Sequence, residues 1–243
     1  RRPVWALLRD GGHQARYVVD QLRRLRREGM AWKDMTVLYR AHYHAMELQM
    51  ELARERIPYA VTSGIRFFEQ AHIKDVCSLV RILHQPGDEL AFTRLMGLLP
   101  GVGARTAAKL WQALGGRCET RTAEQRRNLA ARLPAPARGR WAALEPVLAG
   151  YADALRDDPA EIVFQFHRLF YDQYAIDAFD DYERRNEDIQ EVMAFMSGFE
   201  SVEAFLNEVA LVTNLDAEAD RPGAESRDLL RLGTVHQAKG LEW

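Results

Sequence analysis

The chain has 243 residues, of which 47% are apolar and 28% are charged, and its net charge is −2 at pH 7. This balance is ordinary for a globular protein with a hydrophobic core, and it means that any nucleic-acid site must be a local basic surface. The two cysteines, Cys77 and Cys118, form no C-x-x-C pattern, which excludes a disulfide framework, and no apolar run reaches the roughly 18–20 residues of a membrane span.

The first 64 residues alternate strand and helix signals. Strands are predicted at "VWALLRD" (4–10), "MTVLYR" (35–40) and "PYAVTS" (58–63). Helices are predicted at 13–28 and 45–56, where apolar residues recur at close to helical spacing. Strands and helices that alternate in this way are typical of an α/β domain with a mostly parallel sheet.

Residues 65–222 show helical periodicity almost throughout and no convincing strand. Proline and glycine pairs such as Pro86-Gly87 and Pro100-Gly101 divide the region into separate helices. The predicted helices span about 71–84, 88–98, 104–114, 123–131, 139–155, 159–170, 182–197 and 201–212. This region is therefore predicted to be a separate, mainly helical unit.

An acidic stretch at 214–227 is interpreted as a linker that leads back to a last strand at 229–235. We expect this strand to join the first three, which gives an α/β domain with a partial parallel sheet of about four strands, interrupted by an all-α insertion. A complete sheet would need more chain beyond Trp243, so a fragment of a longer protein is expected. The predicted domain bounds are 1–64, 65–222 and 223–243.

The stretch "LPGVGARTAAKLWQAL", residues 99–114, predicts a tight turn between two helices, with Gly101 and Gly103 in the turn. The second helix directs its backbone N–H groups at the turn, where they suit an anion such as a phosphate. Arg105 and Lys109 lie four residues apart, on one exposed face. This pattern indicates a helix-hairpin-helix clamp on DNA phosphates, without sequence preference; the alternative is an ordinary helical connection with two solvated cations.

A run of arginines follows between residues 117 and 140, and such a run is more typical of a solvated face than of a site. Arg40 ends the second predicted strand and precedes His42, Tyr43 and His44. Cations and aromatic rings at a strand end suit single-stranded nucleic acid, although an ion pair of Arg40 with packed rings would also explain them. His42 and His44 lack a third ligand for a metal site.

The last ten residues, "TVHQAKGLEW", place polar donors in a strand-to-loop turn. Thr234, His236 and Lys239 could hold phosphates or sugar oxygens there, and Glu242 could accept a hydrogen bond from a ribose hydroxyl. The sequence contains no G-x-x-x-x-G-K-[ST] loop, so it is not expected to be a self-contained ATPase.

Several of these blocks together resemble the UvrD/Rep/PcrA family of superfamily 1 DNA helicases. "TVHQAKGLEW" resembles helicase motif V, and residues 37–76 resemble the motif IV region of the second motor domain. "LPGVGARTAAKL" resembles the G-I-G-x-x-T turn of the inserted subdomain 2B, and "VEAFLNEVALVTNLD" resembles the segment that leads out of it. The resemblance covers nearly all of the chain in the family's order.

The resemblance implies a RecA-like domain 2A interrupted by a mainly helical subdomain 2B, within an ATP-dependent 3′–5′ DNA helicase that acts in repair or replication. It implies that single-stranded DNA is contacted by Arg40, His42, Thr234, His236 and Lys239. It implies that duplex phosphates are gripped by Gly101, Gly103, Arg105 and Thr106, with Lys109 beside them, and that Glu242 contacts the nucleotide ribose. In this family the phosphate-binding loop and the metal-binding carboxylates lie outside the matching region.

The parent protein is therefore expected to use ATP and Mg²⁺, whereas the fragment alone is expected to have no catalytic residues, no metal site and no cofactor. Its expected partners are a junction of single-stranded and duplex DNA and repair or replication proteins, in the bacterial cytoplasm at the nucleoid, with no membrane. Three positions depart from the family pattern, with His42, Met46 and Ser63 in place of Asn, Arg and Gly.

Two other interpretations stay open. The chain could be the corresponding region of a helicase-nuclease of the RecB or AddA kind, which would carry a nuclease domain downstream. It could also be a stand-alone helical module that binds DNA or protein, in which the motif V resemblance has no function. A phosphate-binding G-K-T loop upstream would favour a helicase.

Overall fold

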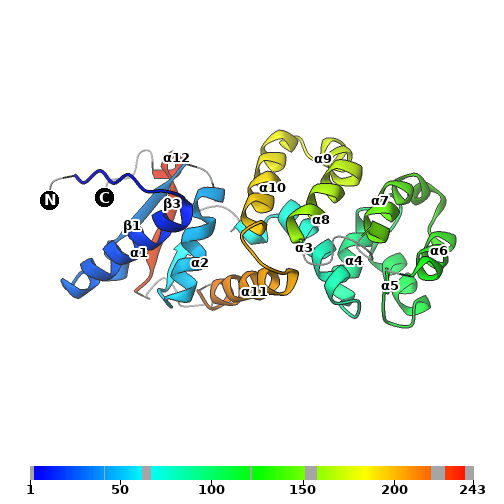
Figure 1. Ribbon diagram of the computed structural model, residues 1–243, viewed down its shortest axis with the longest axis horizontal. Coiled ribbons are helices and arrows are strands. Elements are labelled where there is room, and N and C mark those ends of the chain that lie inside the picture. Colours follow the sequence, from blue (N-terminus) through cyan, green and yellow to red (C-terminus); the bar gives the residue numbers. More distant parts are fainter. Residues whose placement is uncertain are drawn as a thin grey trace. The chain divides into compact units, whose positions relative to one another are not determined.

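The structure is a computed structural model that describes residues 3–40, 42–61, 67–120, 122–150, 158–219 and 228–238 (Figure 1). The chain divides into two compact units. Residues 1–69 and 207–243 form the first unit, and residues 70–206 form the second. Each unit has its own core and is described by itself.

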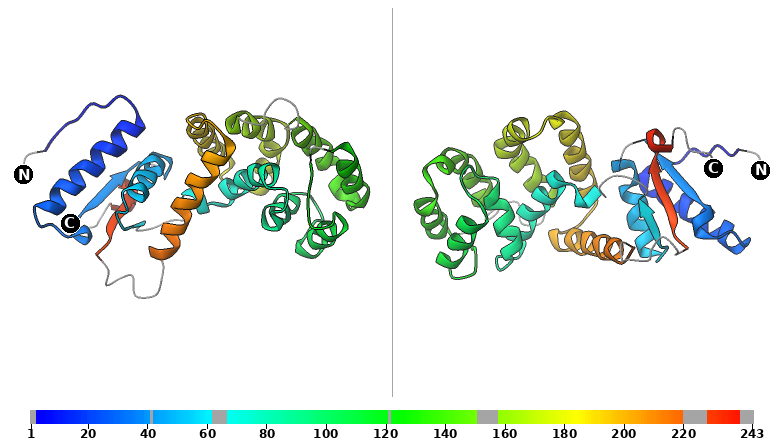
Figure 2. Two further views of the ribbon diagram at one scale, coloured as in Figure 1. Left: turned by 60° about the horizontal axis from the view of Figure 1, so that its bottom comes forward. Right: turned by 180° about the vertical axis from the view of Figure 1, so that it is seen from behind.

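The first unit is built on a parallel sheet of β1 (Thr36–Tyr39), β2 (Tyr59–Val61) and β3 (Leu230–Thr234). The strand order is β1-β3-β2, so the strand that comes last in the chain lies in the centre, as Figure 2 also shows. Because β3 hydrogen-bonds to both earlier strands, the prediction that the last strand joins the first segment's sheet is confirmed.

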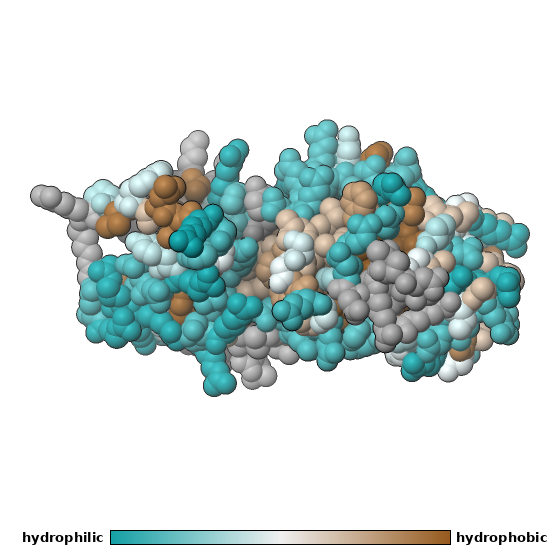
Figure 3. All heavy atoms as spheres, in the orientation of Figure 1, coloured by the Kyte–Doolittle hydropathy of each residue, from teal (hydrophilic) through white to brown (hydrophobic). Residues whose placement is uncertain are grey.

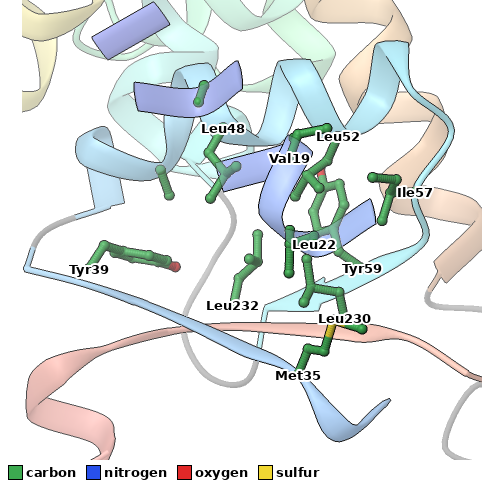
Figure 4. Packing of buried hydrophobic residues seen from close by; sticks show 12 residues of the cluster. Val19, Leu22, Met35, Tyr39, Leu48, Leu52, Ile57, Tyr59, Leu230 and Leu232 are labelled. Carbon is green, nitrogen blue, oxygen red and sulfur yellow. The ribbon is translucent and has the colours of Figure 1, made fainter. Parts of the chain in front are cut away.

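Two helices, α1 (Gly11–Arg27) and α2 (Met46–Arg54), pack on this sheet (Figure 4). The helix α1 begins where the carboxylate of Asp10 accepts a hydrogen bond from the backbone N–H of His13 at 2.8 Å. Val19 and Leu22 of α1 recur at helical spacing and face the strands. Further members of this core are Leu48, Leu52, Ile57, Tyr59, Leu230 and Leu232.

The predicted strand at residues 4–10 is wrong. Residues 3–8 have no regular secondary structure, and the side chains of Val4, Trp5 and Leu7 are 79%, 93% and 90% exposed. A strand needs a neighbour that takes up its backbone N–H and C=O groups, and among the described residues the sheet consists of β1, β2 and β3 only. The described sheet thus has three strands instead of about four.

The described part of the first unit also holds most of α11 (Val202–Ala219) and four short helices, η1 (Trp32–Asp34), η2 (His42–Ala45), η3 (Phe67–Glu69) and α12 (Val235–Ala238). The short helix η2 follows β1 closely, and α12 follows β3 without a gap. Both therefore begin at the carboxyl end of the sheet, where parallel-sheet proteins place their ligands.

The second unit is helical throughout its described residues, as predicted. Its elements are α3 (Ala71–His84), α4 (Glu89–Gly97), α5 (Ala104–Ala113), α6 (Ala123–Arg132), η4 (Ala135–Ala137), α7 (Arg138–Gly150), α8 (Pro159–Phe166), η5 (His167–Tyr171), α9 (Asp172–Ala178), α10 (Tyr182–Met196) and the start of α11 (Val202–Ala219). Because α11 continues to Ala219, the predicted linker at 214–227 begins too early. Residues 220–227 lie outside the described part.

The helix predicted at 159–170 also ends too early. The chain stays helical from α8 through one π-helical turn, η5, and on through α9 to Ala178. A π turn holds one extra residue and so rotates the side chains that follow it. Tyr171, the last residue of this turn, donates a hydrogen bond of 2.6 Å from its hydroxyl to Asp75 on α3.

Buried polar groups join the helices of the second unit. The carboxylate of Asp75 accepts hydrogen bonds from the Tyr171 hydroxyl and from Nε of Arg94, at 2.6 Å and 2.7 Å, and burial raises its pKa. His72 Nδ1 lies 3.0 Å from Nη1 of Arg185, which can only donate, so Nε2 of the neutral ring donates to Asp188 at 3.1 Å. These bonds tie α3 to α4, η5 and α10.

Both cysteines are free and buried, and burial raises the pKa of each thiol to about 12. The face seen in Figure 3 is mainly hydrophilic, with apolar atoms gathered in small groups. Within the described part of the chain, no helix is both long and apolar enough to cross a bilayer.

Candidate nucleic-acid interface

The turn between α4 and α5 is the most distinctive local feature of the second unit. The backbone N–H of Val102 donates to the carbonyl of Leu99 at 3.1 Å, which closes the turn. Gly101 adopts a φ of +76°, a conformation that favours glycine, whereas Gly103 has an extended backbone with φ −88° and ψ 178°. Only the first glycine is therefore required by the turn geometry.

A buried valine anchors this turn. Val102 is 5% exposed, although the glycines on either side of it are exposed. Below it α4 packs against α5, and the rings of Phe92 and Trp111 lie 5.0 Å apart between their centroids. The turn is thus held firmly by the core while its outer backbone faces solvent.

The helix α5 has the two faces that the sequence predicted. Ala107, Leu110 and Trp111 are buried, whereas Arg105 and Lys109 are exposed. Neither exposed cation forms an ion pair within the described part of the chain.

Within the described part of the chain, the N-terminus of α5, which begins after Gly103, has no side-chain cap hydrogen bond. The half-buried Thr106 lies in its first turn. In contrast, the carboxylates of Asp88 and Asp158 cap α4 and α8. The first N–H groups of α5 are therefore not occupied by a side-chain cap.

An open hollow of about 560 Å³ lies against the turn. Residues Gly97 to Gly103 form one side of it, and Arg140, Tyr174, Asp177 and Ala178 form the other. Sequence reasoning missed this second side, because α7 and α9 reach the turn only through tertiary packing. Arg140 belongs to the arginine run that was interpreted as a solvated face, but it is half-buried.

The predicted residues of the first unit lie at the carboxyl end of its sheet. Thr234, which is 7% exposed, ends β3 directly beside Tyr39 of β1, and the exposed Arg40 follows Tyr39. A second hollow, of about 230 Å³, is lined by Tyr39, Arg40 and His44, together with residues of α1 and α2. Burial raises the pKa of Tyr39 to about 12. The structure thus brings Arg40 and Thr234 to one edge.

The remaining predicted residues are described in part or not at all. His42 belongs to η2 and His236 to α12, but their side chains lie outside the described part. Lys239 and Glu242 lie entirely outside the described residues. Their roles stay predictions.

A comparison with protein families finds one match, over the first part of the chain. Residues 8–121 match the family model of the UvrD-like helicase C-terminal domain. This match covers the first-unit segment with β1 and β2, and it also covers the glycine turn before α5.

Individual relatives extend the similarity along the chain. DNA helicase II of Escherichia coli (strain K12) is 28% identical over 242 residues, which cover 95% of this chain and 33% of the relative. The ATP-dependent DNA helicase PcrA of Bacillus subtilis is 25% identical over 226 residues, 86% of this chain and 30% of the relative. UvrD1 of Mycobacterium tuberculosis is 34% identical over 103 residues, 41% of this chain and 13% of the relative.

Along most of its length the chain is thus similar to UvrD-type DNA helicases, in agreement with the resemblance inferred from the motifs. It spans about a third of the length of the curated relatives that it matches.

Proposed function

We propose that the chain works in an ATP-dependent 3′–5′ DNA helicase of the UvrD type and contributes its contacts to duplex and single-stranded DNA. The observation that carries the proposal is the exposed glycine turn before α5, with an uncapped helix N-terminus and two cations beside it. The names of the relatives, DNA helicase II and ATP-dependent DNA helicase PcrA, support it.

In this proposal the second unit is the 2B subdomain, and its turn is a helix-hairpin-helix clamp on the duplex. Gly101 shapes the turn, and Gly103 leaves room for a phosphate because no atom lies within 4 Å of where its Cβ would be. The N–H groups up to Thr106 donate to the phosphate oxygens, and Arg105 and Lys109 neutralise the charge. Such contacts read the DNA backbone and no base sequence.

The first unit is in this proposal part of a RecA-like 2A domain. Its strand ends offer Arg40 and Thr234 at one edge to single-stranded DNA, with His42, His236 and Lys239 as further contacts. Glu242 is assigned to the nucleotide ribose. These roles depend on the motif resemblance.

ATP and Mg²⁺ belong to the longer enzyme that we propose. Among the residues that the structure describes, no group of three or more His, Cys, Asp or Glu side chains is placed to hold a metal ion. No step of ATP hydrolysis is assigned to these residues. Repair or replication proteins as partners, and the bacterial cytoplasm as the location, are parts of the same proposal.

Two variants test the division of work between the units. Replacing Arg105 and Lys109 by alanine should weaken binding to a labelled duplex by about tenfold at low salt, because two phosphate contacts are lost. It should leave binding to an oligothymidine strand unchanged. Arg40→Ala should do the reverse, and fluorescence anisotropy with both DNAs measures both effects.

The matched control replaces Arg24 and Arg27, two exposed cations on α1, by alanine. This double variant removes the same charge as the α5 variant. It should bind both DNAs like the unaltered chain. If the α1 control weakened duplex binding as much as the α5 variant did, net charge alone would explain the binding, and the clamp assignment would be wrong.

A further inference from the structure

The hollow beside the glycine turn contains a charged pair that the turn motif does not include. Nη2 of Arg140, on α7, contacts Oδ2 of Asp177, on α9, and also donates to the carbonyl of Gln173 at 3.4 Å. The other carboxylate oxygen of Asp177 accepts a hydrogen bond from the Gln173 side chain at 3.0 Å. Asp177 thus has a fixed orientation and holds the guanidinium at the wall of the hollow.

This wall is rigid. The ring of Tyr174 lies 5.2 Å from that of Tyr171 and 6.0 Å from that of Phe179, measured between centroids. Tyr171 is itself tied to α3 through the buried carboxylate of Asp75. Because the guanidinium of Arg140 is paired with Asp177, a phosphate in the hollow would have to draw Arg140 away from that carboxylate.

The position of Asp177 is unfavourable for its own helix. It is the second-last residue of α9, where the negative end of the helix dipole disfavours a carboxylate. The carboxylate also lies in the hollow against the turn, where it would repel a phosphate. The hydrogen bond from Gln173 and the ion pair with Arg140 offset this cost, so the carboxylate stays at the wall and holds a neighbouring cation there.

We propose that Arg140 is a further phosphate-binding residue of this site and that Asp177 competes with duplex DNA for it. The proposal depends on the proposed function of the turn. When Asp177 is paired with Arg140, the pair adds no net charge to the hollow, and the turn binds duplex DNA weakly. When a duplex phosphate displaces the carboxylate, Arg140 adds one contact to those of Arg105 and Lys109.

The test measures duplex binding over a salt series with the 243-residue chain. Asp177→Asn should tighten binding about fivefold at low salt and steepen the slope of log affinity against log salt by about 0.9, because one more phosphate is neutralised. The double variant R140Q/D177N should lose this gain. The matched control is Asp181→Asn, which breaks a similar pair with Arg185; Asp181 is 47% exposed and Asp177 is 55% exposed.

The Asp181 variant should bind like the unaltered chain. The inference is overturned if the Asp177 and Asp181 variants bind equally, or if R140Q/D177N keeps the gain. Thermal unfolding shows whether each variant is folded. If Asp177→Asn unfolds at a lower temperature than the unaltered chain, Asp177→Ser takes its place. If the Arg105/Lys109 variant loses duplex binding but Asp177→Asn binds like the unaltered chain, only this inference is rejected. Absence of duplex binding by the unaltered chain rejects the proposed function as well.

Discussion

Replacing Gly103 by aspartate should weaken duplex binding by more than about tenfold while the second unit stays folded. Asp is a preferred N-cap residue, and Gly103 already has the extended backbone of an N-cap, so the helix should gain a cap. A Cβ at this position meets no atom within 4 Å. The new carboxylate would occupy the N–H groups of α5 and repel the phosphate that we assign to them. Anisotropy with a labelled duplex and thermal unfolding measure the two effects.

The control for this variant is Gly87→Asp. Gly87 also has open space where a Cβ would be, and it lies at the far end of α4, a helix of 9 residues. The change adds the same charge about 13 Å of helix away from the turn. Equal loss of binding in the two variants would mean that net charge is responsible, and unimpaired binding of Gly103→Asp would show that the turn does not hold a phosphate.

Replacing Asp75 by alanine should lower the free energy of unfolding of the second unit by about 3 kcal/mol. Asp75 is 3% exposed, and its carboxylate accepts hydrogen bonds from Tyr171 and Arg94. Its removal leaves the Tyr171 hydroxyl, which is buried in the core, without an acceptor. The expected loss is at the low end for a buried pair because the Arg94 side chain is 36% exposed and can turn to water.

Denaturant unfolding followed by circular dichroism measures this loss. Tyr171→Phe should cost less, about 1–2 kcal/mol, because it removes one hydrogen bond and leaves the carboxylate paired with Arg94. Asp88→Ala, which removes the cap of α4, provides a reference of about 1 kcal/mol. A loss at Asp75 no larger than that of the cap variant would contradict the role given to the buried network.

The sequence predicted local features of the second unit well. The helix at 71–84 was predicted with the bounds of α3, and the inward and outward faces of α5 follow from the spacing of its apolar residues. Helical periodicity and proline or glycine breaks are local signals, so they can be recognised in the sequence without knowledge of the tertiary packing. The two glycines of the turn looked equivalent in the sequence, but only Gly101 needs a positive φ.

Features that depend on distant partners could not be predicted in the same way. The apolar run around Trp5 resembles a strand, yet a strand also requires a pairing edge, which the local sequence does not reveal. Arg140 and Asp177 reach the turn because α7 and α9 pack beside it. The π turn η5, which directly precedes the helix of Tyr174 and Asp177, has no recognised local signature. Sequence reasoning therefore could not show that Arg140 and Asp177 form the second side of the candidate site.

The salt dependence of duplex binding tests the central claim most directly. Each phosphate contact contributes about 0.9 to the slope of log affinity against log salt, so alanine at both Arg105 and Lys109 should flatten the slope by about 1.8. The measurement compares the unaltered chain with this double variant, using anisotropy of one labelled duplex across a salt series. A slope flattened by about that amount is the result that we predict; an equal slope in both proteins would contradict the phosphate clamp and leave the turn as a simple connection between α4 and α5.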